Sequence, residues 1–139
     1  MAVFESKLDK KSDAYTKNRA DQLEKLALLR GLEQRAVDAS ERRRPRFEER
    51  GQLTPRDRLA RLLDPGMPFL TLYNMASYCV DDPNRDTSVP GGSVLAGIGY
   101  VSGVRVMIVV DDSGINAGAA TEMGFRKSLE VMRIALKNK

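Results

Sequence analysis

The stretch SVLAGIGYVSGVRVMIVV, residues 93–110, decides the fold of this chain. Two runs rich in β-branched residues, 94–101 and 104–110, are separated by Ser102-Gly103, which is the spacing of a tight β-hairpin. The second run is almost entirely apolar, so we expect it to lie deep in a sheet.

The sequence after the hairpin predicts a small-residue loop and then a helix. Asp111 and Asp112 lead into a loop of Ser, Gly, Ala and Thr, and TEMGFRKSLEVMRIALKN, residues 121–138, follows with helical spacing of its apolar residues. We expect this helix to pack on the sheet through a large apolar stripe and an adjoining stripe of smaller residues. The large stripe comprises Phe125, Leu129, Met132 and Leu136, and the smaller one Ser128, Val131 and Ala135. Arg126 and Glu130 are spaced to form an ion pair.

The sequence before the hairpin predicts a helical arm. Residues 12–39 have one apolar face, and the helix should end before Pro45, since proline disrupts a helix interior. Thr54 followed by Pro55 indicates the start of a short helix over 55–63. After a turn at 64–66, MPFLTLYNM, residues 67–75, predicts a strand, and residues 81–92 a loop. The expected fold class is therefore α/β, with a basic helical arm over 1–66 and a sheet-containing part over 67–139.

Composition narrows the possible chemistry. The 139 residues suit one modest domain, and the chain has no histidine, which removes Ser-His and Cys-His nucleophile systems and the commonest metal ligand. We expect no metal site. The single Cys79 cannot form an internal disulfide, and no apolar run is long enough to cross a membrane. We expect a cytoplasmic protein or one of an organellar matrix.

Charge is concentrated in the arm. Residues 1–63 carry 16 Lys and Arg against 11 Asp and Glu, whereas residues 64–139 carry 7 against 8. Arginines at 42–44, 46 and 50 could bind phosphates, but the glutamates between them also fit a solvated or interface-forming surface. Nucleic acid is disfavoured as a partner, because Phe47 is the one aromatic residue among these arginines.

Two features near the hairpin could carry chemistry. Asp111 and Asp112 could act as an acid and base pair, or one could form a turn while the other faces solvent. Gly91-Gly92 and the loop 113–121 have side chains small enough for a ligand to approach the backbone N–H groups. The alternative for this loop is tight packing against the sheet.

The order of these pieces resembles the start of the carboxyltransferase (β) subunit of biotin-dependent acyl-CoA carboxylases, the propionyl-, methylcrotonyl- and geranyl-CoA carboxylase relatives. The resemblance rests on GQLTPRDRLARLLDPGMPFLTL, on VPGGSVLAGIGYVSGVRVMIVVDDSGINAGA and on the helix end MRIALKN. It implies a crotonase-like fold of repeated ββα units and transfer of CO2 from carboxybiotin to the α-carbon of an acyl-CoA. Backbone N–H groups of glycine-rich loops stabilise the oxyanions in that family, which suits a chain without histidine.

The resemblance also implies site residues. The family loop NDATVKGG is occupied here by residues 111–118, with Asn116 where lysine is common and Ala117 in place of the first glycine. The backbone N–H groups of Ala117 and Gly118 are therefore the expected oxyanion donors. In the basic stretch from Arg50 to Leu59, Gln52 stands where the family has a lysine. The expected contacts to the CoA phosphates are Arg43, Arg46 and Arg50.

Family subunits are much longer than this chain. We therefore expect it to be the amino-terminal portion of such a subunit, with a partial crotonase-like core, acyl-CoA as substrate and no covalently bound cofactor. The expected partners are the remainder of the carboxyltransferase chain, a biotin carboxylase and a biotin carrier, in a large homo-oligomeric complex without nucleic acid or membrane. The alternative is a non-catalytic module whose helical arm docks on a partner subunit.

Overall fold

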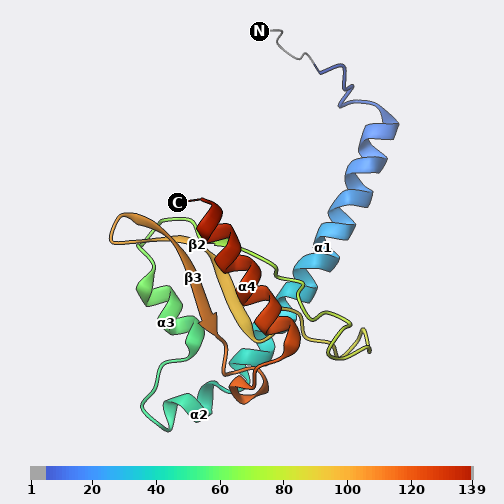
Figure 1. The fold of residues 1–139 in the computed structure, drawn as a ribbon. Coiled ribbons are helices and arrows are strands. Elements are labelled where there is room, and N and C mark those ends of the chain that lie inside the picture. Colours follow the sequence, from blue (N-terminus) through green and yellow to red (C-terminus); the bar gives the residue numbers. More distant parts are fainter. Residues whose placement is uncertain (1–5, 139) are drawn as a thin grey trace. The chain divides into compact units, whose positions relative to one another are not determined.

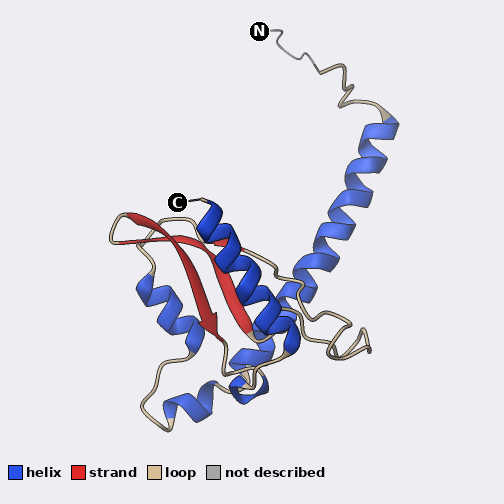
Figure 2. Cartoon of the chain, in the orientation of Figure 1, coloured by secondary structure: helices blue, strands red, loops and turns tan. Residues whose placement is uncertain are grey.

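The computed structural model describes residues 6–138 and divides the chain into two units, one ending at Gly31 and one beginning at Leu32. Figure 1 shows the course of the chain and Figure 2 its secondary structure. The elements, in order, are α1 (Asp13–Glu41), α2 (Arg44–Glu48), α3 (Pro55–Leu62), β1 (Leu70–Thr71), β2 (Val94–Val101), β3 (Val104–Asp111), the short 3₁₀ helix η1 (Asn116–Gly118) and α4 (Glu122–Lys137). Three helices precede three strands, and a further helix follows them, so the chain combines helices with one sheet as the α/β prediction states. The predicted boundary after residue 66 stays a prediction.

Both helix boundaries predicted in the arm are confirmed. α1 ends at Glu41, before Pro45, and Pro45 instead occupies the first turn of α2, where a missing N–H breaks no helical bond. Thr54 is the N-cap of α3, and its Oγ1 accepts a hydrogen bond of 3.1 Å from the N–H of Asp57.

The predicted hairpin is also confirmed. β2 and β3 pair antiparallel along their whole length, from Val94 opposite Asp111 to Val101 opposite Val104. Ser102 and Gly103 form the two-residue turn, and both have positive φ angles, 52° and 78°, which fits the right-handed twist of the strands.

Two sequence predictions about the sheet were wrong. The strand order is β1-β2-β3, so β3 is an edge strand rather than a deeply buried one, and among the described residues none pairs with its outer side. Val104 and Val109 are 60% and 39% exposed. The strand predicted over 67–75 is confined to β1, Leu70–Thr71, because the chain turns away from β2 at Tyr73, whose φ is +54°.

Helix α4 lies against the sheet, in contact with β2 and β3 (Figure 1). The small stripe of the helix faces the strands. Val131 is fully buried against Val94 and Ala96, and Gly124 comes so close to Gly92 that a Cβ at Gly124 would stand 2.4 Å from the Gly92 carbonyl oxygen. This contact directs the small stripe toward the sheet. The large apolar stripe therefore remains accessible, with Phe125 and Leu136 each 64% exposed, contrary to the prediction that it packs on the sheet.

The ion pairs on α4 also differ from the prediction. Arg126 pairs with Glu122, and Glu130 pairs with Arg133. Both pairs follow helical spacing and lie on the exposed side of the helix. The helix α3 packs on the opposite face of the sheet, where a Cβ at Gly99 would meet Leu63.

Candidate functional site

An arginine-lined pocket of about 200 Å³ lies beside the loop that follows β3. Residues 43, 46 and 50 stand at helical spacing along α2 and its ends, so their side chains share one face. The pocket is lined by Arg43, Arg46, Phe47, Arg50, Gln52, Ser113 and Ala117. The arm and the small-residue loop, which the sequence analysis considered separately, thus meet at one place.

The arginines of this pocket are exposed and carry no salt bridge to any of residues 6–138. Their neighbour Arg44 differs, since it binds Glu41 at 2.5 Å and Asp57 at 2.7 Å. The hydrogen bond from Arg44 lowers the pKa of Asp57 to about 2, and the same carboxylates raise the pKa of Arg44. The local acids therefore neutralise Arg44 and leave Arg43, Arg46 and Arg50 available to an anion.

The two expected oxyanion donors are in different situations. The N–H of Ala117 donates no hydrogen bond to the described part of the chain, and Ala117 lines the arginine pocket. The N–H of Gly118 donates to the carbonyl of Ile115 at 3.1 Å, and Gly118 lines a neighbouring hollow with Thr121 and Phe125. Both residues have positive φ angles, 54° and 80°. In this loop conformation the N–H of Ala117 can donate to a ligand, whereas the N–H of Gly118 must first release its hydrogen bond to Ile115.

The loop that carries Ala117 is anchored by Asp112, which is 1% exposed. Its Oδ1 accepts hydrogen bonds from the hydroxyl of Ser40 at 2.7 Å and the N–H of Gly114 at 3.2 Å. Its Oδ2 lies 3.0 Å from Nε of Arg56. These two atoms form an ion pair but do not meet the geometry of a hydrogen bond. Asp111 is exposed and its carboxylate accepts no hydrogen bond from the described residues. This arrangement favours the turn interpretation of the two aspartates over an acid and base pair.

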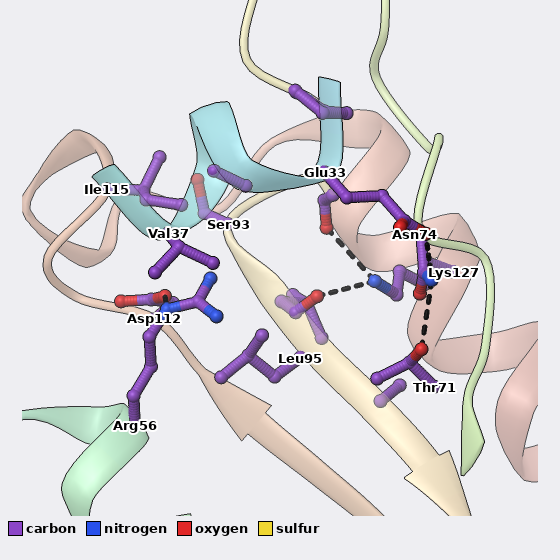
Figure 3. A pocket seen from close by; sticks show the side chains of 15 residues that line it. Glu33, Val37, Arg56, Thr71, Asn74, Ser93, Leu95, Asp112, Ile115 and Lys127 are labelled. Carbon is purple, nitrogen blue, oxygen red and sulfur yellow. Dashed lines mark hydrogen bonds and ion pairs between the residues drawn. The ribbon is translucent and has the colours of Figure 1, made fainter. Parts of the chain in front are cut away.

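A second pocket, of about 220 Å³, contains a buried lysine that the sequence analysis did not select (Figure 3). Lys127 is 5% exposed, and its ammonium donates to the carbonyls of Val94 at 2.5 Å and Gly91 at 3.2 Å. Burial, together with the nearby charge of Arg56, lowers the pKa of Lys127 to about 8. Its position in the sequence could have indicated this burial, because Lys127 stands at helical spacing between the buried Gly124 and Val131.

Other polar groups complete the wall of the second pocket (Figure 3). The amide of Asn74 donates to Glu33 at 2.8 Å and to Thr71 at 2.9 Å, and the Arg56–Asp112 pair closes one side. This wall contains two acids and two bases, so its charges balance within the protein. The pocket therefore differs from the arginine pocket, whose lining includes no acidic side chain among the described residues.

Neither pocket offers a metal site. Within residues 6–138 no group of three or more His, Cys, Asp or Glu side chains could hold a metal ion, and no helix is long and apolar enough to cross a membrane.

Comparison with known sequences identifies the family. Residues 46–139 match the carboxyl transferase domain. The chain belongs to the carboxyl transferase domain family. It is 41% identical over 103 residues to the biotin-dependent 3-methylcrotonyl-coenzyme A carboxylase beta1 subunit of Mycobacterium tuberculosis, covering 74% of this chain and 19% of that protein. It is 33% identical over 138 residues to a probable biotin-dependent acyl-coenzyme A carboxylase beta2 subunit of the same organism, covering 99% of this chain and 25% of the relative.

Solved structures show the same carboxyl transferase fold, which confirms the crotonase-like prediction. The β subunit of Pseudomonas aeruginosa geranyl-CoA carboxylase superimposes with a TM-score of 0.89 at 40% identity, covering 99% of this chain and 25% of that one. The transcarboxylase 12S structure with methylmalonyl-coenzyme A bound gives 0.65 at 27% identity, covering 88% and 23%. This carboxyl transferase chain thus spans a quarter or less of the length of these relatives.

Proposed function

We propose that this chain is the acyl-CoA-binding amino-terminal portion of an acyl-CoA carboxylase carboxyltransferase subunit. The observation that carries the proposal is the arginine pocket. Its lining includes three arginines that form no salt bridge with the described residues, and Ala117, whose N–H donates no hydrogen bond to them. An acyl-CoA has anionic phosphates at one end and a thioester carbonyl at the other, so it needs both kinds of partner.

Arg43, Arg46 and Arg50 would hold the phosphates. A guanidinium group presents paired N–H donors that match phosphate oxygens, and these three are exposed and not neutralised by local acids. This assignment uses the arginines that Glu41 and Asp57 leave free, and excludes Arg44, which they engage.

The N–H of Ala117 would stabilise negative charge on the thioester oxygen. The α-carbon of the acyl group loses a proton, and the resulting enolate carries its charge on that oxygen, where a backbone donor lowers the barrier. Carboxybiotin, carried by a partner subunit, would supply the CO2 that forms the new carbon–carbon bond. Gly118 would contribute a second donor after releasing Ile115. The described residues that line the pocket with Ala117 include no carboxylate, so the base would come from biotin or from another segment.

The proposed partners follow from the same assignment. They are the remainder of a carboxyltransferase chain, a biotin carboxylase and a biotin carrier, within a larger homo-oligomer in the cytoplasm or an organellar matrix. The similarity to subunits of biotin-dependent carboxylases, and to a transcarboxylase described as a hexamer, supports such an assembly.

A scaffold role is the second candidate, favoured by the surface of α1 within the first unit. Leucines 23, 26 and 29 recur at helical spacing and are 47%, 45% and 38% exposed, which is an apolar stripe suited to a partner helix. In this case the chain would bind a partner subunit without adding to carboxylation.

Calorimetric titration with acetyl-CoA and dephospho-CoA tests the acyl-CoA assignment. We expect charge reversal at Arg43, Arg46 or Arg50 to weaken binding by about tenfold each, from the loss of a charge-assisted hydrogen bond. Arg61→Glu, an exposed charge reversal on α3 outside the pocket, is the matched control and should bind normally. Equal affinity of all the variants would contradict the proposal.

A complementation assay separates the two roles. The chain is mixed with the missing carboxyltransferase segment of a related subunit, a biotin carboxylase and a biotin carrier, and carboxylation of acyl-CoA is measured. Activity that appears on mixing and falls with Arg43→Glu supports the carboxyltransferase role. Association without activity supports the scaffold role.

A further inference from the structure

Lys127 is a buried cation that no carboxylate of the described chain neutralises. The residue is 5% exposed, and its ammonium group donates to the carbonyls of Val94 and Gly91, which carry no net charge. It forms no salt bridge with the described residues. Burial and then the charge of Arg56 lower its pKa to about 8, and no acidic group among the described residues offsets either effect. Below pH 8 the ammonium therefore remains charged in a setting where proteins usually pair a charge.

The two carboxylates in the wall of this cavity have other partners. Glu33 accepts a hydrogen bond of 2.8 Å from the amide of Asn74. Asp112 faces Arg56 and accepts hydrogen bonds from the end of α1 and from its own loop. The charges of the wall balance in total, but these contacts leave a local excess of positive charge at Lys127.

Arg56 is a second cation that faces the cavity. Figure 3 shows its guanidinium group and the ammonium group of Lys127 on opposite sides of the space, each pointing toward the other. Nε of Arg56 lies beside Asp112, whereas its two terminal nitrogens donate no hydrogen bond to the described residues. Lys127 has three N–H groups, of which the two carbonyls use two. An anion placed between the two side chains would accept hydrogen bonds from both and offset their mutual repulsion.

The rest of the lining sets the size and polarity of the ligand. The cavity has a volume of about 220 Å³. A cavity of roughly 150 Å³ accommodates benzene, so this one suits a molecule of roughly seven to nine non-hydrogen atoms. A phosphate or sulfate needs hydrogen bonds on every oxygen, and oxygens that lie against aliphatic side chains would have none. The aliphatic part of the lining comprises Ala36, Val37, Pro90, Val94, Leu95, Ala96 and Ile115.

We infer that this cavity binds a free, short-chain aliphatic carboxylate. The carboxylate group would lie between Arg56 and Lys127, and the chain against Val37, Leu95 and Ile115 (Figure 3). An Asp or Glu side chain from another segment offers the same charged group, but it brings only one or two methylene groups and would leave part of the aliphatic lining uncovered. The cavity shares no lining residue with the arginine pocket, so this inference stands apart from the proposed function.

Calorimetric titration of the full chain with 3-methylbutanoate tests the inference, with 3-methylbutanamide as the uncharged analogue of the same shape. We expect saturable one-to-one binding of the carboxylate and about tenfold weaker binding of the amide, which lacks the charge. Lys127→Met removes one cation and should weaken binding of the carboxylate by about tenfold. Lys137→Met, the same substitution at the exposed end of α4, is the matched control and should bind normally.

A second variant and a spectroscopic measurement locate the site. Ala36→Leu places a larger side chain in the cavity without changing its charges, and should abolish binding while circular dichroism shows an intact fold. The methyl NMR signals that shift most during the titration should be those of Val37, Leu95 and Ile115. Undiminished affinity of the Ala36→Leu variant, or shifts confined to Ala117 of the arginine pocket, would overturn the inference.

The titration is repeated on the chain mixed with the remainder of a carboxyltransferase chain, which separates a free acid from a protein side chain. Retained affinity in this mixture supports a free carboxylate. Loss of binding would show that the added segment fills the cavity, and would overturn the inference. Equal affinity for the acid and the amide, or binding unaffected by Lys127→Met, would also overturn it.

Discussion

The hydroxyl of Ser40 donates a 2.7 Å hydrogen bond to Oδ1 of Asp112, joining the end of α1 to the loop that follows β3. Both residues are 1% exposed, and a Cβ at Gly114 would stand 2.5 Å from the Ser40 hydroxyl. The loop is therefore held against α1 by one buried carboxylate and by the absence of a side chain at Gly114. This contact fixes the position of Ala117 next to the arginine pocket.

Removal of the Asp112 carboxylate should destabilise the protein strongly. Asp112→Ala leaves the partly buried Arg56 guanidinium and the Ser40 hydroxyl without their partner, and we expect the free energy of unfolding to fall by about 3 kcal/mol. Chemical denaturation gives this value. The control is Asp86→Ala in an exposed loop, expected to change stability by less than about 0.5 kcal/mol. Equal effects of the two substitutions would refute the anchoring role.

Loss of the N-cap of α3 should have a smaller effect. Thr54 is buried and its Oγ1 accepts the N–H of Asp57, so Thr54→Ala should lower the free energy of unfolding by about 1 kcal/mol. Thr54→Ser retains the hydroxyl and should recover most of the loss. Urea titrations of the three proteins make the comparison; an alanine variant as stable as the serine variant would show that the cap contributes nothing.

Lys127 should make stability depend on alkaline pH. Its pKa is about 8 in the folded protein against 10.5 for an ordinary lysine. Between these values the unfolded chain binds more protons than the folded one, so the free energy of unfolding rises with pH, by at most about 3 kcal/mol. Below pH 8 the penalty for the buried charge is fully present.

Lys127→Met supplies the comparison for this pH effect. The side chain of methionine does not titrate, so the rise between pH 8 and 10.5 should disappear when unfolding is followed by circular dichroism. An identical pH profile for the variant and the unmodified chain would show that another group is responsible.

Two helical glycines should respond to alanine in opposite directions. At Gly124 a Cβ would stand 2.4 Å from the Gly92 carbonyl oxygen, so Gly124→Ala should destabilise by about 1–3 kcal/mol as α4 is forced from the sheet. At Gly31, in α1, a Cβ meets nothing within 4 Å, and Gly31→Ala should stabilise by up to about 1 kcal/mol. Thermal unfolding of both variants measures the difference, and effects of equal sign would argue against the close α4 contact.

Local sequence signals predicted much of the fold because they act over a few residues. Thr54-Pro55 defined the start of α3, Ser102-Gly103 the turn of the hairpin, and Pro45 the end of the preceding helix. Each depends on backbone conformation or on a cap whose partners are nearby in the chain. The arginines at 43, 46 and 50 were selected from the family resemblance, and their spacing of three and four residues places them on one face.

The orientation of α4 and the burial of Lys127 depend on contacts with residues that are distant in sequence. Periodicity showed that α4 is amphipathic but assigned its large apolar stripe to the sheet, because hydrophobicity alone does not reveal that Gly124 must meet Gly92. The burial of Lys127 depends on the carbonyls of Gly91 and Val94, which lie 36 and 33 residues earlier in the chain.

The sequence by itself determined the family, the hairpin, the helix boundaries and the charge of the arm, since all of these depend on residue identity and local spacing. Only the tertiary structure decided that β2 lies between β1 and β3 in the described sheet, that Asp112 is a buried anchor, and that Ala117 shares a pocket with the three arginines. The physical reason is that strand order, burial and convergence arise from contacts between segments far apart along the chain, which no local pattern of residues specifies.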